Sequence, residues 1–242
     1  MNLSRRVKFL ILILLSLSVI FIYNNTNNHN INYTVIGDGL SYGIDCYGRI
    51  DYGYSDYIKD YLLKTNKLKK YSNEYTKENM MIDTLYTTLL MNENMSSNNI
   101  KVDIKTILRD TDYLTMTIGL NDLLYKLSLT SEFTEQNLNI VINEIKQSFD
   151  RLIIEIRKVY KRPIYIIGYY NIEKDNEFIN LAIKKLNQIY QQNDEIVYIP
   201  TYELSENRNI FLPNPSSYYP NYKGYQLIST KIIDKISKKL EK

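Results

Sequence analysis

Three short segments of the sequence combine side chains that could take part in bond-making chemistry. They read GDGLSYG at residues 37–43, GLND at residues 119–122 and SSYYPNYKGY at residues 216–225. Hydroxyl, carboxylate and carboxamide groups supply the nucleophile, the orienting acid and the oxyanion donor in acyl-transfer sites. Such a site also needs a general base, most often histidine. The single histidine of the sequence, His29, lies outside all three segments.

Alternating strand-like and helix-like stretches must position these segments. Short apolar runs typical of buried strands occur at residues 33–37, 112–119, 163–170 and 196–200. Helical spacing of apolar residues occurs at 54–65, 80–90, 134–161 and 176–192, and in a final helix from about residue 223. This alternation predicts a three-layer α/β/α fold with a central parallel sheet. The polar residues that follow the strands are then expected at the carboxyl edge, where ligands bind.

The order and spacing of the three segments resemble the SGNH hydrolases, or GDSL-type esterases, over nearly all of residues 33–242. In that family the first segment reads G-D-S-L with a nucleophilic serine, and the second reads G-x-N-D with an asparagine that donates to the oxyanion. The third reads D-x-x-H-P-N with a histidine base and its orienting aspartate. YGIDCYGRIDYGYSDYIKDYL and PNYKGYQLI are also similar to bacterial esterases of this family. The resemblance implies an SGNH hydrolase-like, flavodoxin-like domain.

The chain departs from the family pattern where the chemistry is most demanding. Gly39 stands at the nucleophile position, Tyr219 at the base position and Ser216 at the position of the orienting aspartate. Losing the nucleophile or the base of such a triad lowers turnover by a factor on the order of 10⁶. We therefore interpret the chain as a degenerate family member and expect no catalytic residues.

Few polar residues of the family pattern remain. Asn121 survives, with Asp38 and Asp122 beside the empty site, but residues 54–118 contain no glycine to supply the family's second oxyanion donor. Asn and Asp also brace turns by bonding to nearby backbone. The surviving residues are thus explained either by turn geometry or by retained ligand binding.

A relocated active site is the alternative to lost catalysis. Ser41 is the nearest non-phenolic hydroxyl, two residues past Gly39. A two-residue shift in a strand-to-helix turn points its side chain elsewhere, and no base lies nearby to deprotonate it. Tyr219 is a poor substitute base, because an unperturbed phenol titrates near pH 10. We expect Ser41 and Ser216 to serve as helix-cap or turn hydroxyls.

Tyrosines are abundant around the same strand ends. Their rings and hydroxyls suit sugar or peptide recognition, although with 24 tyrosines in the chain some must cluster by composition alone. The tyrosines expected at this rim are Tyr42, Tyr47, Tyr169, Tyr170, Tyr218, Tyr219, Tyr222 and Tyr225.

The N-terminus has the pattern of a membrane signal. Arg5, Arg6 and Lys8 precede an uncharged apolar run at residues 9–23, and neither an A-x-A-like cleavage site nor a lipobox cysteine follows. We predict a membrane anchor or signal segment at 1–23, a polar tether at 24–32 and the SGNH hydrolase-like domain at 33–242. The domain is then extracytoplasmic on a single-pass anchor, or secreted if the segment is cleaved.

Composition excludes several other classes of protein. The net charge is only +3, and no basic stripe interleaved with aromatics indicates nucleic-acid binding. The one cysteine, Cys46, rules out an internal disulfide framework. No phosphate loop, dinucleotide fingerprint or metal-ligand cluster is present, so we expect no cofactor and no metal. The bias towards Asn, Ile, Lys and Tyr indicates a low-GC bacterium.

Three functional hypotheses follow. The first is a catalytically inactive binding or scaffolding module on the outer face of the cell membrane, with an envelope glycan, lipid or protein as partner. The second is a divergent esterase or deacylase that acts on envelope lipids or glycans. The third is a purely structural member of a membrane complex.

Overall fold

The computed structural model describes residues 30–97 and 100–240, together with Ile13 and Ser16. The rest of the predicted membrane anchor and most of the predicted tether lie outside the described residues. Within the described part of the chain, no helix is both long enough and apolar enough to cross a membrane.

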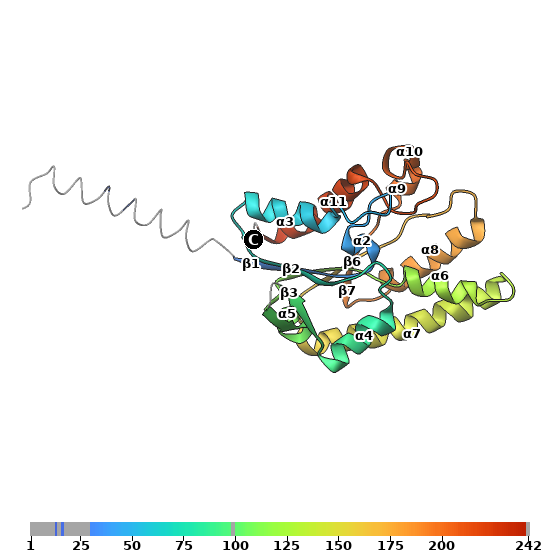
Figure 1. Ribbon diagram of the computed structural model, residues 1–242, viewed down its shortest axis with the longest axis horizontal. Coiled ribbons are helices and arrows are strands. Elements are labelled where there is room, and N and C mark those ends of the chain that lie inside the picture. The colour runs from blue at the N-terminus through green and yellow to red at the C-terminus, as the bar shows by residue number, and fades with distance from the viewer. Residues whose placement is uncertain (1–12, 14–15, 17–29, 98–99, 241–242) are drawn as a thin grey trace, which may run out of the picture.

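A five-stranded parallel sheet forms the middle layer (Figure 1). Its strands, in spatial order, are β2 (Leu68–Thr76), β1 (Ile31–Gly37), β5 (Tyr113–Thr117), β6 (Ile164–Ile167) and β7 (Ile196–Ile199). Every neighbouring pair runs parallel. The three inner strands are buried along nearly their whole length, because helices cover both faces of the sheet.

Helices form the two outer layers (Figure 1). On one side lie α2 (Gly39–Tyr42), α3 (Tyr54–Lys64), α9 (Glu203–Glu206), α10 (Arg208–Phe211) and α11 (Tyr222–Leu240). On the other side lie α4 (Ile82–Met91), α5 (Ile104–Asp110), α6 (Leu120–Ser128), α7 (Glu135–Val159) and α8 (Glu177–Gln191). The predicted three-layer α/β/α architecture is confirmed.

The longest helix, α7, illustrates how the sequence sets an element. Its buried face repeats at helical spacing through Leu138, Val141, Ile145 and Phe149. Its first turn is capped by the side chain of Thr134, which accepts a hydrogen bond from the amide of Asn137. Burying each large apolar side chain contributes about 2 kcal/mol, so this face holds the helix against the hydrophobic core.

Some elements carry no clear sequence signal. The edge strand β2 reads LKKYSNEYT, a polar composition that keeps sheet edges from pairing with other chains. The helix α6 follows Gly119 directly, where only a turn is predicted. The hairpin of β3 (Asn94–Ser97) and β4 (Ile100–Asp103), the short helix α5, and α9 and α10 are further additions to the predicted order.

The first strand begins two residues earlier than predicted. β1 starts at Ile31, so the last residues of the predicted tether belong to the sheet. The reason is a pair of contacts made by Asn32. Its amide donates to the carboxylate of Asp112 at 2.8 Å, and its side chain donates to the carbonyl of Asp110 at 2.7 Å.

Parallel strands give the domain two distinct ends. The carboxyl edge is the end at which the strands finish and the covering helices begin. The amino edge is the end at which the strands start and most of those helices finish. In Figure 1 the start of β1 and the C-terminal end of the chain both lie at the amino edge, on the left.

Candidate functional site

The three segments singled out in the sequence meet at the carboxyl edge of the sheet. Residues 37–43 lead from β1 into α2, residues 119–122 lead from β5 into α6, and residues 216–225 lead into α11. All three contribute to the wall of one small cavity. Its lining residues are Asp38, Leu40, Leu120, Asn121, Tyr169, Tyr170, Ile172, Tyr218 and Tyr219.

Tyr219 occupies the space in which a side chain at residue 39 would lie. A Cβ atom added to Gly39 would lie 2.1 Å from Tyr219 Oη and 2.6 Å from Cζ, far inside van der Waals contact. Tyr219 is 7% exposed, and its ring centroid lies 4.6 Å from that of Tyr218. Burial raises the pKa of the Tyr219 phenol above its ordinary value. The phenol therefore stays protonated at neutral pH and cannot accept a proton as a general base.

Asp38 is a buried carboxylate held by neutral donors. Thr117 Oγ1 donates to it at 2.5 Å, the amide of Leu40 donates at 3.2 Å, and the Tyr169 hydroxyl also donates to it. Burial raises the pKa of Asp38, and the hydrogen bonds from Thr117 and Tyr169 offset part of that shift. Every one of these contacts braces the turn between β1 and α2.

Ser41 points into the protein interior. Its Oγ lies 2.8 Å from Tyr54 Oη and 2.8 Å from Thr117 Oγ1, and the amide of Thr117 also donates to it. The side chain is buried and does not line the cavity. The structure therefore places Ser41 in a structural network of hydroxyl groups and away from any position for nucleophilic attack.

Asn121 lies in the cavity wall, but its amide group is already engaged. Its Nδ2 donates to the carbonyl of Glu78 at 3.1 Å and to the carbonyl of Met80 at 3.0 Å. A carboxamide carries two hydrogens on that nitrogen. With two backbone acceptors in place, no hydrogen of Asn121 remains for an oxyanion.

Asp122 braces the start of α4. Both of its carboxylate oxygens lie 3.2 Å from the amide nitrogen of Ile82, the first residue of that helix. Burial raises the pKa of Asp122 to about 6, and hydrogen bonds from backbone amides oppose the shift. This contact braces a helix start 40 residues away in the sequence, so the expectation that Asp122 braces its own turn stays a prediction.

Ser216 lies on the surface in the loop before α11. Its amide donates to the side chain of Asn214 at 3.0 Å, which makes a local Asx turn. The next serine, Ser217, accepts from the amide of Tyr219 at 3.1 Å. These contacts order the loop that carries Tyr219.

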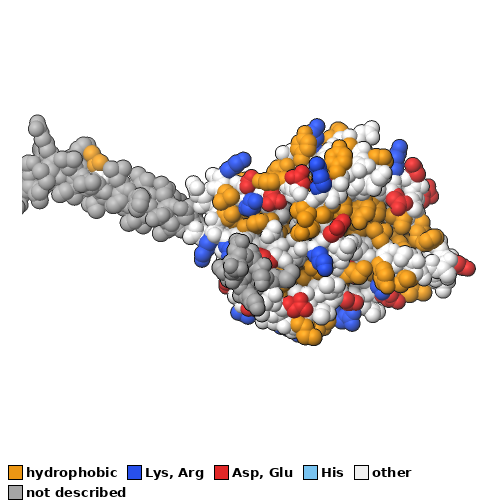
Figure 2. Space-filling view, in the orientation of Figure 1, with side chains coloured by type: hydrophobic (Ala, Val, Ile, Leu, Met, Phe, Trp, Pro, Cys, Tyr) orange, Lys and Arg blue, Asp and Glu red, His pale blue; other side chains and the backbone are white. Residues whose placement is uncertain are grey.

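The cavity is nearly closed by tyrosine rings. The volume open to the centre of a water molecule is about 10 Å³, which is room for about one water. Outside it, a band of hydrophobic side chains runs across the surface between α10 and α6 (Figure 2). Tyr125, Leu129 and Phe133 are exposed on α6 and the connection to α7.

The predicted tyrosine rim divides into three groups. Tyr169, Tyr170, Tyr218 and Tyr219 line the cavity, whereas Tyr47 and Tyr222 are exposed on the surface. The remaining two members do not reach the cavity: Tyr42 is half-buried against the core and Tyr225 is fully buried.

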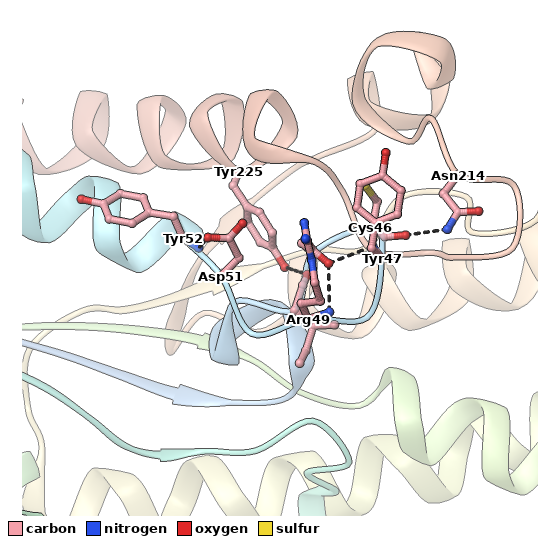
Figure 3. A network of polar contacts seen from close by, with 9 residues as sticks. Cys46, Tyr47, Arg49, Asp51, Tyr52, Asn214 and Tyr225 are labelled. Atoms are coloured by element: carbon pink, nitrogen blue, oxygen red, sulfur yellow. Dashed lines mark hydrogen bonds and ion pairs between the residues drawn. The ribbon is translucent and has the colours of Figure 1, made fainter.

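A surface loop at residues 44–53 is joined to this region (Figure 3). The Asp45 carboxylate accepts from the Arg49 side chain at 2.9 and 2.6 Å, and Arg49 in turn stacks on the ring of the exposed Tyr47. Asn214 donates to the carbonyl of Cys46 at 2.6 Å, and Tyr225 donates to the carbonyl of Ile44 at 2.5 Å. The last two bonds tie the loop to the segment that carries Tyr219.

Sequence reasoning misses two parts of the site. Thr117 and Tyr54 hold Asp38 and Ser41, yet both lie inside elements that read as ordinary strand and helix. The only feature of the sequence that could have identified them is a hydroxyl group among the apolar side chains of a strand or helix. No group of three or more potential metal ligands occurs in the described ranges 30–97 and 100–240, and the expectation that the protein uses no metal stays a prediction.

Comparison with known proteins identifies the family of this chain and other proteins with the same fold. The family model described as GDSL-like Lipase/Acylhydrolase matches residues 19–232. A search of curated proteins finds no match. The lipase Lip_vut3 from a goat rumen metagenome aligns with a TM-score of 0.66 and 19% identity over 85% of this chain and 97% of that chain. Axe2, an acetylxylan esterase from Geobacillus stearothermophilus, aligns with a TM-score of 0.60 and 14% identity over 86% of this chain and 96% of that chain. At these identities the two structures establish a shared fold.

Proposed function

Because this chain belongs to the GDSL-like lipase and acylhydrolase family, we propose that it keeps the family fold without the serine-dependent ester hydrolysis. It acts as a binding or scaffolding module at the bacterial cell envelope, anchored in the membrane by residues 1–23 with the folded domain outside. The observation that carries this proposal is the ring of Tyr219, which fills the space that a nucleophilic side chain at residue 39 needs.

Proton transfer supports the loss of hydrolysis. Acyl transfer by a hydroxyl requires a neighbouring base that removes its proton. The chain has one histidine, His29, which precedes the first strand. Ser41 is buried among hydroxyl groups, and the pKa of Tyr219 is raised by burial. None of these groups forms a nucleophile and base pair at the cavity.

Oxyanion stabilisation is compromised at the same place. The two hydrogens of Asn121 Nδ2 have backbone acceptors. The amide of Leu40 donates to Asp38, and the amide of Ser41 donates to Thr117. Removing a single donor from an oxyanion hole lowers turnover by about 10² to 10³. With these donors engaged, a hydrolysis rate near the uncatalysed one is expected.

Surface chemistry at the carboxyl edge supports binding in place of catalysis. Hydrophobic side chains form a band on the surface between α10 and α6 (Figure 2), and Tyr125, Leu129 and Phe133 are exposed on α6 and the connection to α7. Contiguous apolar surface of this kind is typical of interaction sites. The partner class that we propose is an envelope glycan, lipid or protein that rests on this surface.

A divergent esterase or deacylase is the second candidate function. The family match supports it, because the description of that family is lipase and acylhydrolase. It would need a free general base, but the one carboxylate in the cavity wall, Asp38, already accepts three hydrogen bonds, so a partner chain would have to supply the base. An assay of turnover separates the two candidates.

The test is ester hydrolysis by the purified protein on short acyl esters, beside Ser41→Ala and the triple variant Gly39→Ser, Ser216→Asp and Tyr219→His. We expect no turnover above the buffer rate for the native protein and for Ser41→Ala. Any activity that appears only in the triple variant would show that the scaffold keeps a usable geometry. Native turnover that Ser41→Ala abolishes would establish a relocated active site and refute the proposal.

A further inference from the structure

Charged residues are sorted along the helices of this domain. Asp56 lies in the first turn of α3 and Lys64 in its last, and Glu135 opens α7 while Arg157 and Lys158 end it. Acids at helix starts and bases at helix ends stabilise the helix dipole. Because these helices run back along a parallel sheet, the same arrangement places basic side chains at the amino edge.

The first basic group lies beside the point where the chain enters the domain. The backbone amide of Ile31 donates to the carbonyl of Lys67 at 2.7 Å, so the start of β1 is directly bonded to the turn before β2. Lys64, Lys69 and Lys70 are exposed around this turn. Among the described residues, no ion pair involves these three lysines or Lys67. This group therefore presents uncompensated positive charge.

A second basic group lies where α7 ends and β6 begins. An open cleft of about 460 Å³ has Arg157, Lys161 and Arg162 in its wall, next to Ile196 and Val197 of the edge strand β7. Two of the cations are paired, Arg157 with Glu195 at 2.8 Å and Arg162 with Asp112 at 3.3 Å. Lys161 is exposed and adds its charge to the same edge.

The last turns of α11 bring a third group, with Lys235 and Lys238 exposed. Asp110, Asp194, Glu195 and Asp234 are the exposed acids closest in sequence to these three groups. They are fewer than the exposed lysines just described, so the amino edge carries a net positive charge.

Exposed apolar side chains accompany these cations. Leu63 in the last turn of α3 is 52% exposed, and Leu90 and Met91 at the end of α4 are 46% and 72% exposed. Cations mixed with exposed apolar side chains are the combination that favours a membrane interface, where lipid phosphates and the acyl boundary lie close together.

The reach of the tether determines which end of the domain faces the membrane. Residues 24–30 span at most about 25 Å even when fully extended, whereas a domain of this size is roughly 40 Å across. A chain anchored by residues 1–23 cannot turn its carboxyl edge down to the same membrane. The amino edge, where β1 begins, is the end of the domain nearest the anchor and therefore the end best placed to meet the lipid surface (Figure 1).

We propose that the amino edge docks on the anionic lipid head groups of the membrane that anchors the chain. The docking orients the crevice and its hydrophobic band outward, so their partner belongs to the space beyond the membrane. The proposal rests on the anchored arrangement in the proposed function, and it does not depend on whether the crevice is catalytic.

The test is a lysine footprint of the full chain in lipid nanodiscs, by acetylation and mass spectrometry. Discs of phosphatidylcholine are compared with discs that contain added phosphatidylglycerol. We expect acetylation of Lys64, Lys69, Lys70 and Lys235 to slow at least about threefold in the anionic discs and to recover in high salt. Two exposed lysines, Lys174 before α8 and Lys223 in the first turn of α11, are internal controls, and their acetylation should not change.

Variants that remove lysine charges test whether these lysines cause the docking. In the triple variant Lys64→Gln, Lys69→Gln and Lys70→Gln, we expect the protection of Lys235 to be lost, whereas Lys174→Gln with Lys223→Gln should leave it intact. Equal acetylation at both edges in anionic discs would overturn the docking while leaving the anchor in place. Release of the full chain from discs by 1 M salt would instead refute the anchoring, whatever the esterase assay shows.

Discussion

At the residue scale, Gly39 and Tyr219 form a mutually dependent pair. The missing Cβ of Gly39 leaves the room in which the Tyr219 ring lies. Neither residue reads as structural in the sequence, where both look only like losses from a catalytic pattern. A change to serine at residue 39 alone would therefore clash with the Tyr219 ring. A change to histidine at residue 219 alone would leave no nucleophile at residue 39.

Substitution of Gly39 by alanine is expected to destabilise the protein through this contact. The added Cβ must displace the Tyr219 ring, and overpacking of this kind costs about 1–3 kcal/mol. Gly39 opens α2 and has no positive φ, so its backbone tolerates alanine. Urea denaturation of Gly39→Ala measures the change in the free energy of unfolding.

The same change in a Tyr219→Ala background provides the control. With the ring gone, Gly39→Ala should be neutral or stabilising by up to about 1 kcal/mol, since alanine favours a helix over glycine. An equal cost of Gly39→Ala in both backgrounds would show that the two residues are not coupled.

Asp122 is expected to make stability depend on pH. Its pKa of about 6 in the folded protein lies above its ordinary value, so between about pH 4 and 6 the folded state holds a proton that the unfolded state releases. This contribution to stability is present at low pH and is lost as the pH rises through 6. The loss is on the order of 1–3 kcal/mol.

Asp122→Asn isolates that contribution. The amide oxygen of asparagine can still accept from the amide of Ile82, but it does not titrate. The difference in unfolding free energy between the native protein and Asp122→Asn should therefore change between pH 4 and 7 in favour of the variant at the higher pH. A constant difference across this range contradicts the raised pKa.

At the element scale, the loop at residues 44–53 has its position set by side chains that come from elsewhere in the chain. Asn214 and Tyr225 donate to the carbonyls of Cys46 and Ile44, and these bonds join the loop to the start of α11 (Figure 3). A carbonyl that loses its partner in a buried setting costs about 1–3 kcal/mol. The two bonds are therefore expected to hold the loop in place.

Cys46 is a built-in reporter of this loop, because it is the only cysteine and it is buried. Asn214→Ala removes the bond to its carbonyl and is expected to raise the rate of thiol labelling by about tenfold through local opening. Tyr47→Phe, which changes an exposed hydroxyl on the same loop, should leave the rate unchanged. Equal labelling rates for the native protein and Asn214→Ala would mean that the loop is held by other contacts.

At the scale of the whole molecule, one core joins both outer layers to the sheet. Its buried apolar members run from Ile31 in β1 to Ile236 in α11. The two ends of this single core have different surfaces, with the tyrosine-filled crevice at the carboxyl edge and basic groups at the amino edge. Their separation follows from the parallel direction of all five strands.

A chain that begins at residue 30 is expected to unfold in one cooperative transition. It retains every member of the core, so its melting midpoint should agree within about 3 °C with that of the full chain in the same detergent. Circular dichroism at increasing temperature measures both. A much lower midpoint for the shorter chain would show that residues before 30 contribute to the fold.

Residue identity and periodicity are sufficient to predict the fold and the family of this protein. The alternation of strands and helices predicts the parallel α/β fold, and the three segments identify the family. The absence of serine at residue 39 and of histidine at residue 219 can be read directly, because composition does not depend on conformation. Polar elements such as β2 escape this reading, since pairing with β1 stabilises them more than any pattern of their own.

Only the tertiary structure decides how the emptied site is filled. The sequence places Tyr219 and Asn121 near the carboxyl edge, but it does not show that the ring covers Gly39 or that Nδ2 is bound to two carbonyls. Side-chain directions of this kind depend on packing between segments far apart in the chain. The same holds for the basic amino edge, whose lysines come from helix ends, from the start of β2 and from a connecting loop, and are brought together by the parallel arrangement of strands and helices.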